Sequence, residues 1–409
     1  MKKCIFVIIS LLLVSCGSKS QKTVNEDTDA NVSKTEMRQA VNGLPVIDLQ
    51  KEYPLKQMVL QDVADVTYIP LEITDNALLA NAPFVVTDGF FITYTTHGDV
   101  CFFNRDGRLS HTFNRKGGSG EEYGNIYNFC VDDENVYIND ILLHKIQVYS
   151  YQGEYRRTLN YGRKYTLAMT DYDQDYLLVE DSYDVDIESG ESKNAKAEPY
   201  LKISKKDGQM LPVSLTVHKK RVRDGIGFFA GDNFVTSRIG MSPLARINRK
   251  NVIAEFVLDT VYVYQADNFI PIAVRQNLVK GNDIPMVATL DLLTDRYQLW
   301  YVAEKDIDKK AFSMPDPFSL LYDKHTGECV RVEFSDAGGV SAEIAFKKLK
   351  NRMSGNLHTL PDNCLLQNYP AHFLMELNEK GALKGELKEI ASKLNEDDNP
   401  VLMLAKFRE

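Results

Sequence analysis

Alternating carboxylates are the feature of this chain that most suggests a metal site. Asp171, Asp173 and Asp175 stand at every second position of residues 171–175. Calcium prefers several hard oxygen ligands, so this spacing makes the three residues candidates for a calcium site. The run lacks the glycine and the distal glutamate of an EF-hand loop, and a solvated acidic turn is the simpler interpretation. We therefore expect no resident metal and no other cofactor.

A glycine-rich loop over residues 117–123 offers backbone N–H groups that could cradle an anion. Its candidate ligand-binding residues are Arg115, Glu121, Glu122 and Tyr123. The loop lacks the Lys-Ser/Thr ending of a phosphate-binding P-loop. A structural crossing between two units of the fold is the favoured interpretation, with one of the glutamates capping backbone donors and the tyrosine packing.

The linear sequence contains no catalytic motif. The seven histidines form neither an HxH nor an HExxH pattern, and no GxSxG nucleophile elbow occurs. Catalytic residues could still converge from distant segments, which a linear pattern does not reveal. The sequence therefore names no catalytic residue and favours a protein that is not an enzyme, without deciding the question.

Composition indicates a large acidic globular body. The chain has 409 residues, of which 44% are hydrophobic, and its 48 basic and 57 acidic residues give a formal net charge of −9. This balance excludes a mainly disordered chain and a polytopic membrane protein. The negative charge argues against a nucleic-acid partner. A short basic run, Lys219, Lys220, Arg221 and Arg223, is expected to form a solvated hairpin tip.

The first residues have the form of a lipoprotein signal. Lys2 and Lys3 precede an apolar stretch, residues 4–14, that is too short to span a bilayer as a mature helix. It ends in a match to the lipobox of bacterial lipoproteins over residues 13–17, Leu-Val-Ser-Cys-Gly. This match implies cleavage before Cys16 and attachment of lipid, including an acyl chain such as palmitate, which anchors stably when two or three chains are present. A plain secretory signal is the alternative.

The sequence predicts three segments. They are a signal peptide over residues 1–15, a polar and flexible tether over residues 16–43, and a folded body over residues 44–409. We expect the lipid to hold the body on a membrane of the cell envelope, with the outer membrane favoured. The body would face the periplasm or the cell surface, and the neutral-to-basic residues after the cysteine favour the periplasm.

Four cysteines remain in the body: Cys101, Cys130, Cys329 and Cys364. They show no CxxC spacing, which argues against a zinc site. Each lies in an apolar stretch that predicts a strand, so buried free thiols are the favoured interpretation. An oxidising compartment leaves a disulfide between Cys101 and Cys130 as the alternative.

The body repeats a unit of two hairpins. In the first hairpin two apolar segments flank a polar turn centred on Asp or Asn, residues that tolerate turn conformations. In each of the first five repeats, an aromatic-rich second hairpin follows the first hairpin. The first turns are centred on positions 88, 133, 174, 232, 295 and 362, and the second hairpins span residues 100–109, 146–155, 200–211, 261–270 and 320–329. Four strands per repeat predict a β-propeller with six blades.

The sixth repeat differs from the others. Residues 370–394 carry apolar side chains at helical spacing, which Gly381 and Gly385 are expected to divide into two helices. The last strand, residues 401–407, has no hairpin partner after it, whereas residues 66–72 form a spare strand near the start of the body. Pairing these two strands would complete the sixth blade and remove two exposed edges. The predicted fold is therefore all-β: a six-bladed β-propeller with four-stranded blades, an N-terminal strand that closes the last blade, and a short helical insertion near the C-terminus.

Part of the second repeat resembles an NHL-type propeller repeat. The resemblance rests on the glycine-rich lead-in, the turn Asp132-Asp133, residues 136–140 and residues 144–149. Together with the lipobox and residues 68–72, 259–262 and 398–402, it makes the chain similar to a family of bacterial lipoproteins known as six-bladed β-propellers. The resemblance implies the fold and the lipid anchor, and it implies no reaction.

Three functions fit these observations. The favoured one is a membrane-anchored envelope lipoprotein that acts as a non-catalytic binding propeller for an envelope protein, a peptide or a glycan, because a propeller presents loops on a rigid ring. The alternative is a propeller enzyme, a metal-assisted lyase or hydrolase whose residues converge at the central channel. A structural factor in an outer-membrane complex is the third. Fold alone does not decide among them.

Overall fold

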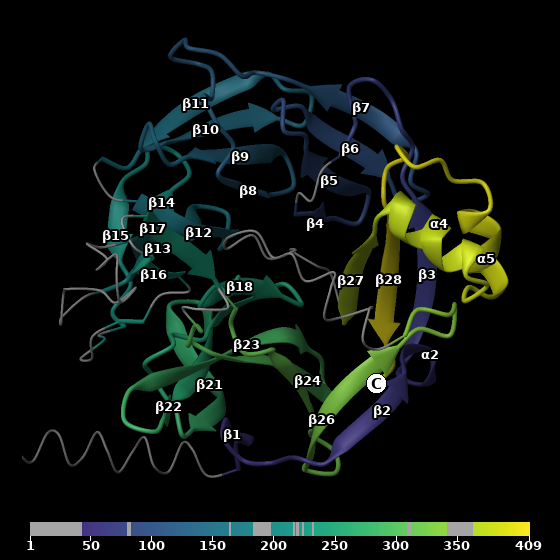
Figure 1. Cartoon of the computed structure of the whole chain (residues 1–409). Helices are drawn as coiled ribbons and strands as arrows, with labels where there is room; N and C mark the ends of the chain where they lie inside the picture. The colour runs from purple at the N-terminus through teal and green to yellow at the C-terminus, as the bar shows by residue number, and fades with distance from the viewer. Residues whose placement is uncertain are drawn as a thin grey trace, which may run out of the picture. The chain divides into compact units, whose positions relative to one another are not determined.

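The Asp-centred turns of the sequence join neighbouring strands in small sheets that stand around a ring (Figure 1). The computed structural model describes residues 43–409 except 80–82, 163–164, 183–197, 216, 218–220, 223–224, 231–232, 309–312 and 342–362. Within these ranges the sheets form the six blades of a β-propeller, which confirms the predicted fold. Gly43–Glu409 is a compact unit with its own hydrophobic core, so we expect it to fold by itself.

The first three blades are four-stranded antiparallel sheets in which consecutive strands pair. Their strands are rich in aromatic and β-branched residues, which suit a surface buried on both faces between neighbouring blades. Blade one contains β4 (Val85–Val86), β5 (Phe90–Tyr94), β6 (Val100–Asn104) and β7 (Leu109–Phe113); blade two contains β8 (Asn128–Val131), β9 (Asn135–Asp140), β10 (Lys145–Ser150) and β11 (Tyr155–Asn160); blade three contains β12 (Tyr165–Asp171), β13 (Tyr176–Ser182), β14 (Tyr200–Ser204) and β15 (Met210–Pro212).

The next two blades have the same four strands and gain further ones at their edges. Blade four contains β18 (Leu244–Ile247), β19 (Lys250–Ile253), β20 (Thr260–Gln265) and β21 (Asn268–Gln276), with β1 (Val46–Asp48) added in parallel; blade five contains β23 (Ile284–Leu293), β24 (Tyr297–Glu304), β25 (Phe318–Asp323) and β26 (Glu328–Ser335), with β22 (Val279–Lys280) on one side and β2 (Leu55–Val59) in parallel on the other.

One predicted hairpin forms but is not the first hairpin of its blade. The hairpin around position 232, β16 (Gly225–Ala230) and β17 (Asn233–Arg238), forms a separate two-stranded sheet, and the first hairpin of blade four is instead β18–β19. The two residues that join β18 to β19, Asn248 and Arg249, both adopt positive φ, 50° and 57°. A two-residue turn with positive φ at both positions is usually marked by Asn-Gly. The β18–β19 turn has Asn-Arg instead, so the sequence does not indicate it. The turn predicted at position 362 lies outside the described residues.

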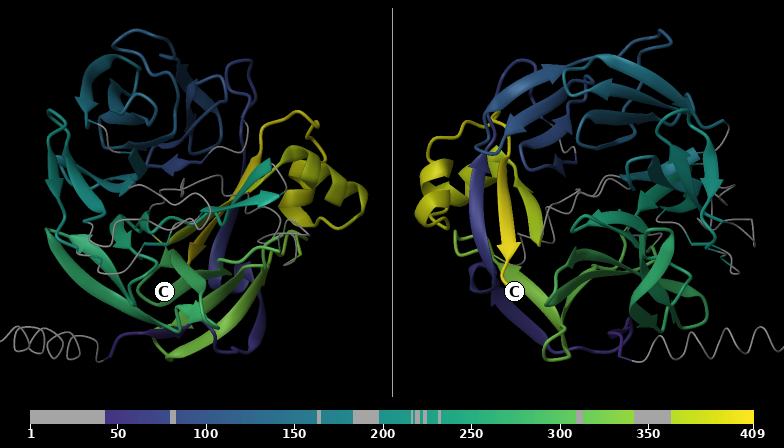
Figure 2. Two further views of the ribbon diagram at one scale, coloured as in Figure 1. Left: turned by 60° about the vertical axis from the view of Figure 1, so that its left-hand side comes forward. Right: turned by 180° about the vertical axis from the view of Figure 1, so that it is seen from behind.

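The sixth blade is closed by the N-terminal strand, as predicted. In the described residues it contains β27 (Cys364–Tyr369), β28 (Val401–Phe407) and β3 (Ala64–Pro70), with β28 between the other two (Figure 2). The register pairs Val401 with Pro70 and Phe407 with Ala64. The closing strand thus begins two residues earlier than predicted. Since β1 and β2 pair with blades four and five, residues 46–70 join three consecutive blades, and we call them the N-terminal strap.

The helical insertion lies between β27 and β28 and contains two helices, α4 (Ala371–Glu379) and α5 (Gly385–Ala391), as predicted. Gly381 follows α4 with a φ of +68°, a conformation that favours glycine and ends the helix. Leu374, Leu377 and Leu387 pack against blades five and six. A third, one-turn helix, α2 (Leu60–Val63), joins β2 to β3. Within the described ranges, no helix has the length and apolarity needed to cross a membrane.

Each junction between neighbouring blades has its own hydrophobic cluster. Cys101 and Cys364 lie in the junction of blades six and one, and Cys130 lies in the junction of blades two and three. All four cysteines of the body, Cys329 included, are free, so the alternative disulfide between Cys101 and Cys130 is not formed.

Candidate functional site: a pocket among the turns of four blades

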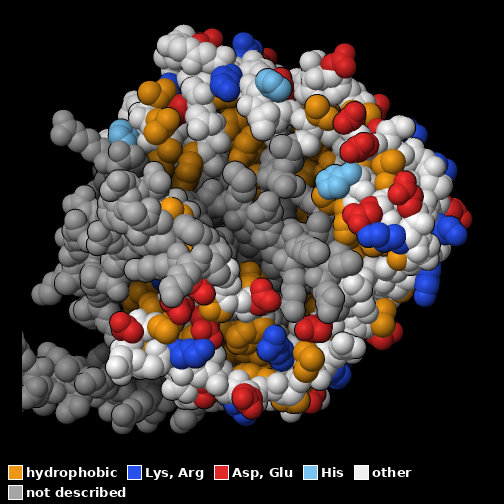
Figure 3. All heavy atoms as spheres, viewed as in Figure 1, with side chains coloured by type: hydrophobic (Ala, Val, Ile, Leu, Met, Phe, Trp, Pro, Cys, Tyr) orange, Lys and Arg blue, Asp and Glu red, His pale blue; other side chains and the backbone are white. Residues whose placement is uncertain are grey.

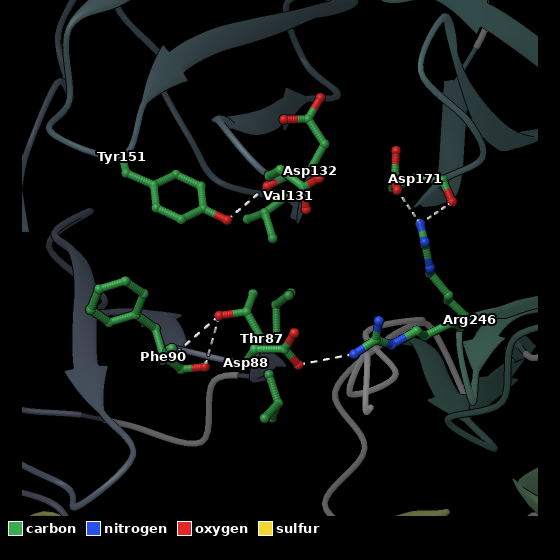
Figure 4. Close-up of a pocket in the computed structure, with 13 residues that line it drawn as sticks. Thr87, Asp88, Phe90, Val131, Asp132, Tyr151, Asp171 and Arg246 are labelled. Atoms are coloured by element: carbon green, nitrogen blue, oxygen red, sulfur yellow. Dashed lines mark hydrogen bonds and ion pairs between the residues drawn. The ribbon is translucent and has the colours of Figure 1, made fainter. Parts of the chain in front are cut away.

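A pocket of about 320 Å³ opens where the turns of blades one to four meet (Figure 4). The inner hairpins of a propeller run side by side around the axis, so their turns gather at one end of the ring. The volume lies at the lower end of the range of small-ligand sites, about 300–1,000 Å³. The pocket is lined by Val85, Val86, Thr87, Asp88, Gly89, Phe90, Val131, Asp132, Asp133, Tyr151, Asp171, Arg246 and Arg249.

One wall of the pocket is aromatic. The rings of Phe90 and Tyr151 meet edge to face, with centroids 6.3 Å apart. The Tyr151 hydroxyl donates to the backbone oxygen of Asp132 at 2.7 Å (Figure 4). Burial, together with the nearby carboxylates of Asp132 and Asp133, raises the pKa of Tyr151, so its hydroxyl stays a donor at neutral pH. The Thr87 hydroxyl accepts from the Phe90 amide at 3.0 Å and fixes the turn of blade one.

The opposite wall contains a chain of ion pairs that crosses three blades. Lys205 donates to Asp132 at 3.0 Å and to Asp171 at 2.7 Å. The guanidinium of Arg246 donates to both the carboxylate and the backbone oxygen of Asp171 (Figure 4). These four side chains are between 6% and 20% exposed, so their charges are mostly removed from water and are stabilised by each other.

Neighbouring groups keep two members of this chain, Asp132 and Lys205, ionised. Burial opposes ionisation of Asp132, but hydrogen bonds from the Tyr137 hydroxyl at 2.6 Å and the Glu134 amide at 3.0 Å, with the charge of Lys205, hold its pKa below the usual value. Burial likewise opposes protonation of Lys205, yet Asp171 and then Asp132 raise its pKa. Asp132 and Lys205 therefore both keep their charge in this wall.

Two further carboxylates lie at the rim of the pocket. Asp88 accepts from Arg249 at 2.9 Å, but the side chains are 85% and 57% exposed, so the pair contributes little. Asp133 is exposed, and its carboxylate has no hydrogen-bond or ion-pair partner in the described part of the chain. Acidic and basic side chains are interspersed over the face of the ring in Figure 3.

The alternating aspartates do not form one site. Asp171 lies in the pocket, where Lys205 and Arg246 occupy its oxygens. Asp173 instead accepts from the amides of Asp175 and Tyr176, at 2.9 and 2.8 Å, and closes the turn between β12 and β13. The residues that the structure describes contain no group of three side chains placed to hold a metal ion.

The glycine-rich loop crosses from blade one to blade two, away from the pocket lining. Tyr123 is fully buried, and its hydroxyl donates to the backbone oxygen of Gly98 at 2.6 Å and accepts from the Arg115 amide at 3.0 Å. The Glu122 carboxylate accepts from the Ser119 amide at 2.8 Å and so caps the loop from within.

Side chains of blade two also bind the carbonyl groups of this loop. Tyr149 donates to the backbone oxygen of Glu121 at 2.6 Å, and Lys145 donates to that of Glu122 at 2.8 Å. Gln147 donates to the backbone oxygens of Gly120 and Glu122 at 2.8 and 2.9 Å. The contacts of Arg115, Glu121, Glu122 and Tyr123 are those of a crossing between blades, which was the favoured interpretation.

The sequence revealed only part of the pocket. The turns that contain Asp88 and Asp133 were recognised from the repeat, but their convergence with Tyr151 and Arg246 was not. Arg249 was missed because its turn was placed elsewhere. The basic run was interpreted wrongly at Arg221, which is fully buried rather than solvated; its other members lie outside the described residues.

A comparison with models of known protein families identifies the family of this chain. The model of a family described as "Domain of unknown function (DUF4934)" matches residues 44–406. The chain belongs to the DUF4934 family. The match begins before β1 and ends within β28, so it covers all six blades of this DUF4934 propeller. No curated protein matches the sequence.

Solved structures support the fold of this DUF4934 propeller. A protein from Bacteroides fragilis NCTC 9343, whose description classes it as exported, has a TM-score of 0.62 at 14% identity, over 89% of this chain and 100% of that one. A DUF4221 family member from Bacteroides vulgatus ATCC 8482 has a TM-score of 0.46 at 7% identity, over 85% and 98%. BamB from Moraxella catarrhalis has a TM-score of 0.37 at 11% identity, over 85% and 99%. The first shows the fold alone, the other two are more distant, and none of the three supports the NHL-type resemblance.

Proposed function

We propose that this DUF4934 propeller is a non-catalytic binding protein of the bacterial cell envelope, and that its ligand binds in the pocket among the turns of blades one to four. The observation that carries the proposal is the pocket itself, in which turns of four blades bring an aromatic wall and a chain of fixed ion pairs together. A site that is ordered before the ligand arrives loses little conformational entropy on binding. An envelope protein, a peptide or a glycan would provide the polar and apolar groups that such walls recognise.

The proposal includes a lipid anchor at Cys16. Residues 1–15 would be removed as the signal peptide, and residues 16–43 would tether the propeller to a membrane, with the outer membrane favoured. The lipobox around Cys16 and the exported character of the similar Bacteroides fragilis protein support this placement. The body would then face the periplasm or the cell surface.

Replacing the anchor cysteine tests the placement. In cells fed an alkyne analogue of palmitate, the wild-type chain should take up label and sediment with membranes, because two or three acyl chains anchor stably. Cys16→Ser should lose both the label and the membrane association, whereas Cys101→Ser should keep them. An unlabelled wild-type chain, or a labelled Cys16→Ser chain, would contradict lipid attachment at this position.

Filling the pocket tests the binding function. Gly89 lines the pocket, and a side chain added there meets no atom within 4 Å of its Cβ, so Gly89→Trp should occupy the pocket without disturbing the turn. Residues 17–409 would be used to select from a random heptapeptide display library and to probe a glycan array. We expect at least one ligand whose affinity falls at least about tenfold, or about 1.4 kcal/mol, in Gly89→Trp.

Gly118→Trp is the matched control. Gly118 lies in the glycine-rich crossing and also has no atom within 4 Å of a built Cβ, so the same substitution there adds the same side chain away from the pocket. The control should keep wild-type affinity. A set of ligands that bind all three proteins equally would refute the pocket as the binding site.

A further inference from the structure

The lining of the pocket contains more carboxylates than cations. Four carboxylates line it against two guanidinium groups, and two further cations lie behind the lining: Lys205, and Arg105, which donates to the backbone oxygen of Thr87 at 3.2 Å and interacts with the charge of Asp88. Arg246 is paired with Asp171, Arg249 with Asp88, and Lys205 with both Asp171 and Asp132. The carboxylate of Asp133 has no hydrogen-bond or ion-pair partner among the described residues, so it is the lining charge that a ligand can pair with.

The remaining lining is apolar. Val85 and Val86 are buried in β4, and Val131 stands beside them at the start of the turn of blade two. Phe90 and Tyr151, whose rings meet edge to face, complete this side. Asp133 also lies close enough to Tyr151 for its charge to act on the phenol. An apolar surface and an unpaired carboxylate therefore adjoin each other.

This combination matches one kind of group. A lysine or arginine side chain has an apolar stem that packs on aliphatic surface and a cationic head that a carboxylate and an aromatic face both attract. An anionic group would meet four carboxylates and would have to displace one of them from an arginine. A neutral sugar would leave the Asp133 carboxylate without an ion-pair partner. The volume of about 320 Å³ equals that of about ten water molecules and admits such a side chain with part of its backbone.

We infer that the pocket receives a lysine or arginine side chain of a partner polypeptide, with Asp133 as its ion-pair partner and Phe90 and Tyr151 as the wall against which its stem packs. The inference rests on the proposed binding function and names its ligand class. It also assigns a role to the second Asp of the Asp132-Asp133 turn. Asp132 is used internally, by Tyr137, Lys205 and the amides of the turn, and Asp133 is left for the partner.

Capped heptapeptides test the inference directly. Four probes share six glycines and differ only in a central Arg, Lys, Gln or Glu residue, and their binding to residues 17–409 would be titrated by saturation-transfer NMR. We expect the Arg and Lys peptides to bind about fivefold more tightly than the Gln peptide, because a partly desolvated cation–carboxylate contact beside aromatic rings is worth about 1 kcal/mol. The preference should weaken as salt is raised, since the carboxylate is exposed.

Asp133→Asn should reduce the preference for the cationic peptides to less than about twofold. Asp106→Asn is the control, since Asp106 is an exposed turn aspartate of blade one that does not line the pocket, and it should leave the preference unchanged. Equal binding of the Arg and Gln peptides, tighter binding of the Glu peptide, no binding of any peptide, or an unchanged preference in Asp133→Asn would each overturn the inference. Display ligands that depend on the pocket but contain no basic residue would overturn it as well, while leaving the binding function intact.

Discussion

Deletion of residues 44–72 will unfold the propeller cooperatively, whereas deletion of residues 17–40 will leave its melting temperature unchanged. The larger deletion removes β1, β2 and β3 and so takes the N-terminal strap from blades four, five and six at once. It breaks the seven residue pairs between β3 and β28 and exposes both edges of the closed ring. The buried apolar side chains lost are Ile47, Leu49, Leu60, Ala64, Ile69 and Leu71.

The expected effect is about as large as the whole stability of an ordinary domain. Each large buried aliphatic side chain contributes about 1.5–3 kcal/mol, and native domains are stable by only about 5–15 kcal/mol. Circular dichroism during heating provides the measurement. The control deletion lies before the compact unit that begins at Gly43 and before the matched family range, so the ring keeps its closure. A normal melt after removal of residues 44–72 would show that the strap does not close the ring.

Arg221→Met should destabilise the fold by about 3–5 kcal/mol at pH 7. Arg221 is fully buried between blades three and four, where it donates to Glu255 at 3.1 and 2.8 Å and to Glu180 at 2.9 Å. Burial opposes protonation of the guanidinium, but Glu255 and then Glu180 raise its pKa, so the group is always charged. Methionine would remove the guanidinium that donates to both buried carboxylates, which is the costly way to break a buried ion pair.

The loss should depend on pH with a definite sign. In Arg221→Met, Glu180 and Glu255 stay buried but lose the guanidinium that donates to both, and burial favours the protonated form of a carboxyl group. In the unfolded chain glutamate titrates near pH 4.3. The folded variant therefore binds more protons than the unfolded one, and its stability rises as the pH falls from 7 toward that value. Urea denaturation at pH 7 and pH 5 measures the free energies of unfolding of the wild type and the variant. The difference between these two free energies should be smaller at pH 5 than at pH 7.

Two companion variants separate charge from packing. Arg221→Lys keeps the charge but not the planar fork, so it should fall between wild type and Arg221→Met. Adding Glu255→Gln to Arg221→Met removes one of the two buried negative charges and should recover part of the lost stability. If Arg221→Met were as stable as the wild type at pH 7, the buried pairs would have no structural role.

The repeat made the fold predictable from the sequence, because each turn with Asp, Asn or Gly between apolar segments is a local signal. The β18–β19 hairpin could not be predicted, because Arg249 adopts a left-handed conformation that composition does not reveal. The strands β1 and β2 could not be predicted for another reason. They are short and pair in parallel with residues more than two hundred positions away, so they leave no local pattern.

The pocket could be predicted only in pieces. Asp88, Asp132 and Asp133 stood in recognised turns, but nothing in the sequence shows that Lys205 and Arg246 neutralise two of the neighbouring aspartates and leave Asp133 alone. Arg221 illustrates the same limit. Its basic neighbours suggested a solvated turn, whereas two glutamates from different blades bury it. Pairing between distant charges depends on the closed ring, and spacing along the chain does not encode it.

The claim that the pocket holds the ligand can be measured most directly in the envelope itself. A photo-reactive benzoylphenylalanine placed at position 89 in the full lipidated chain, with position 118 as the reference, would be irradiated in intact cells. The account predicts a discrete crosslinked partner from position 89 and none from position 118, because only the former lines the pocket. Equal crosslinking from both positions, or crosslinking from position 118 alone, would contradict it.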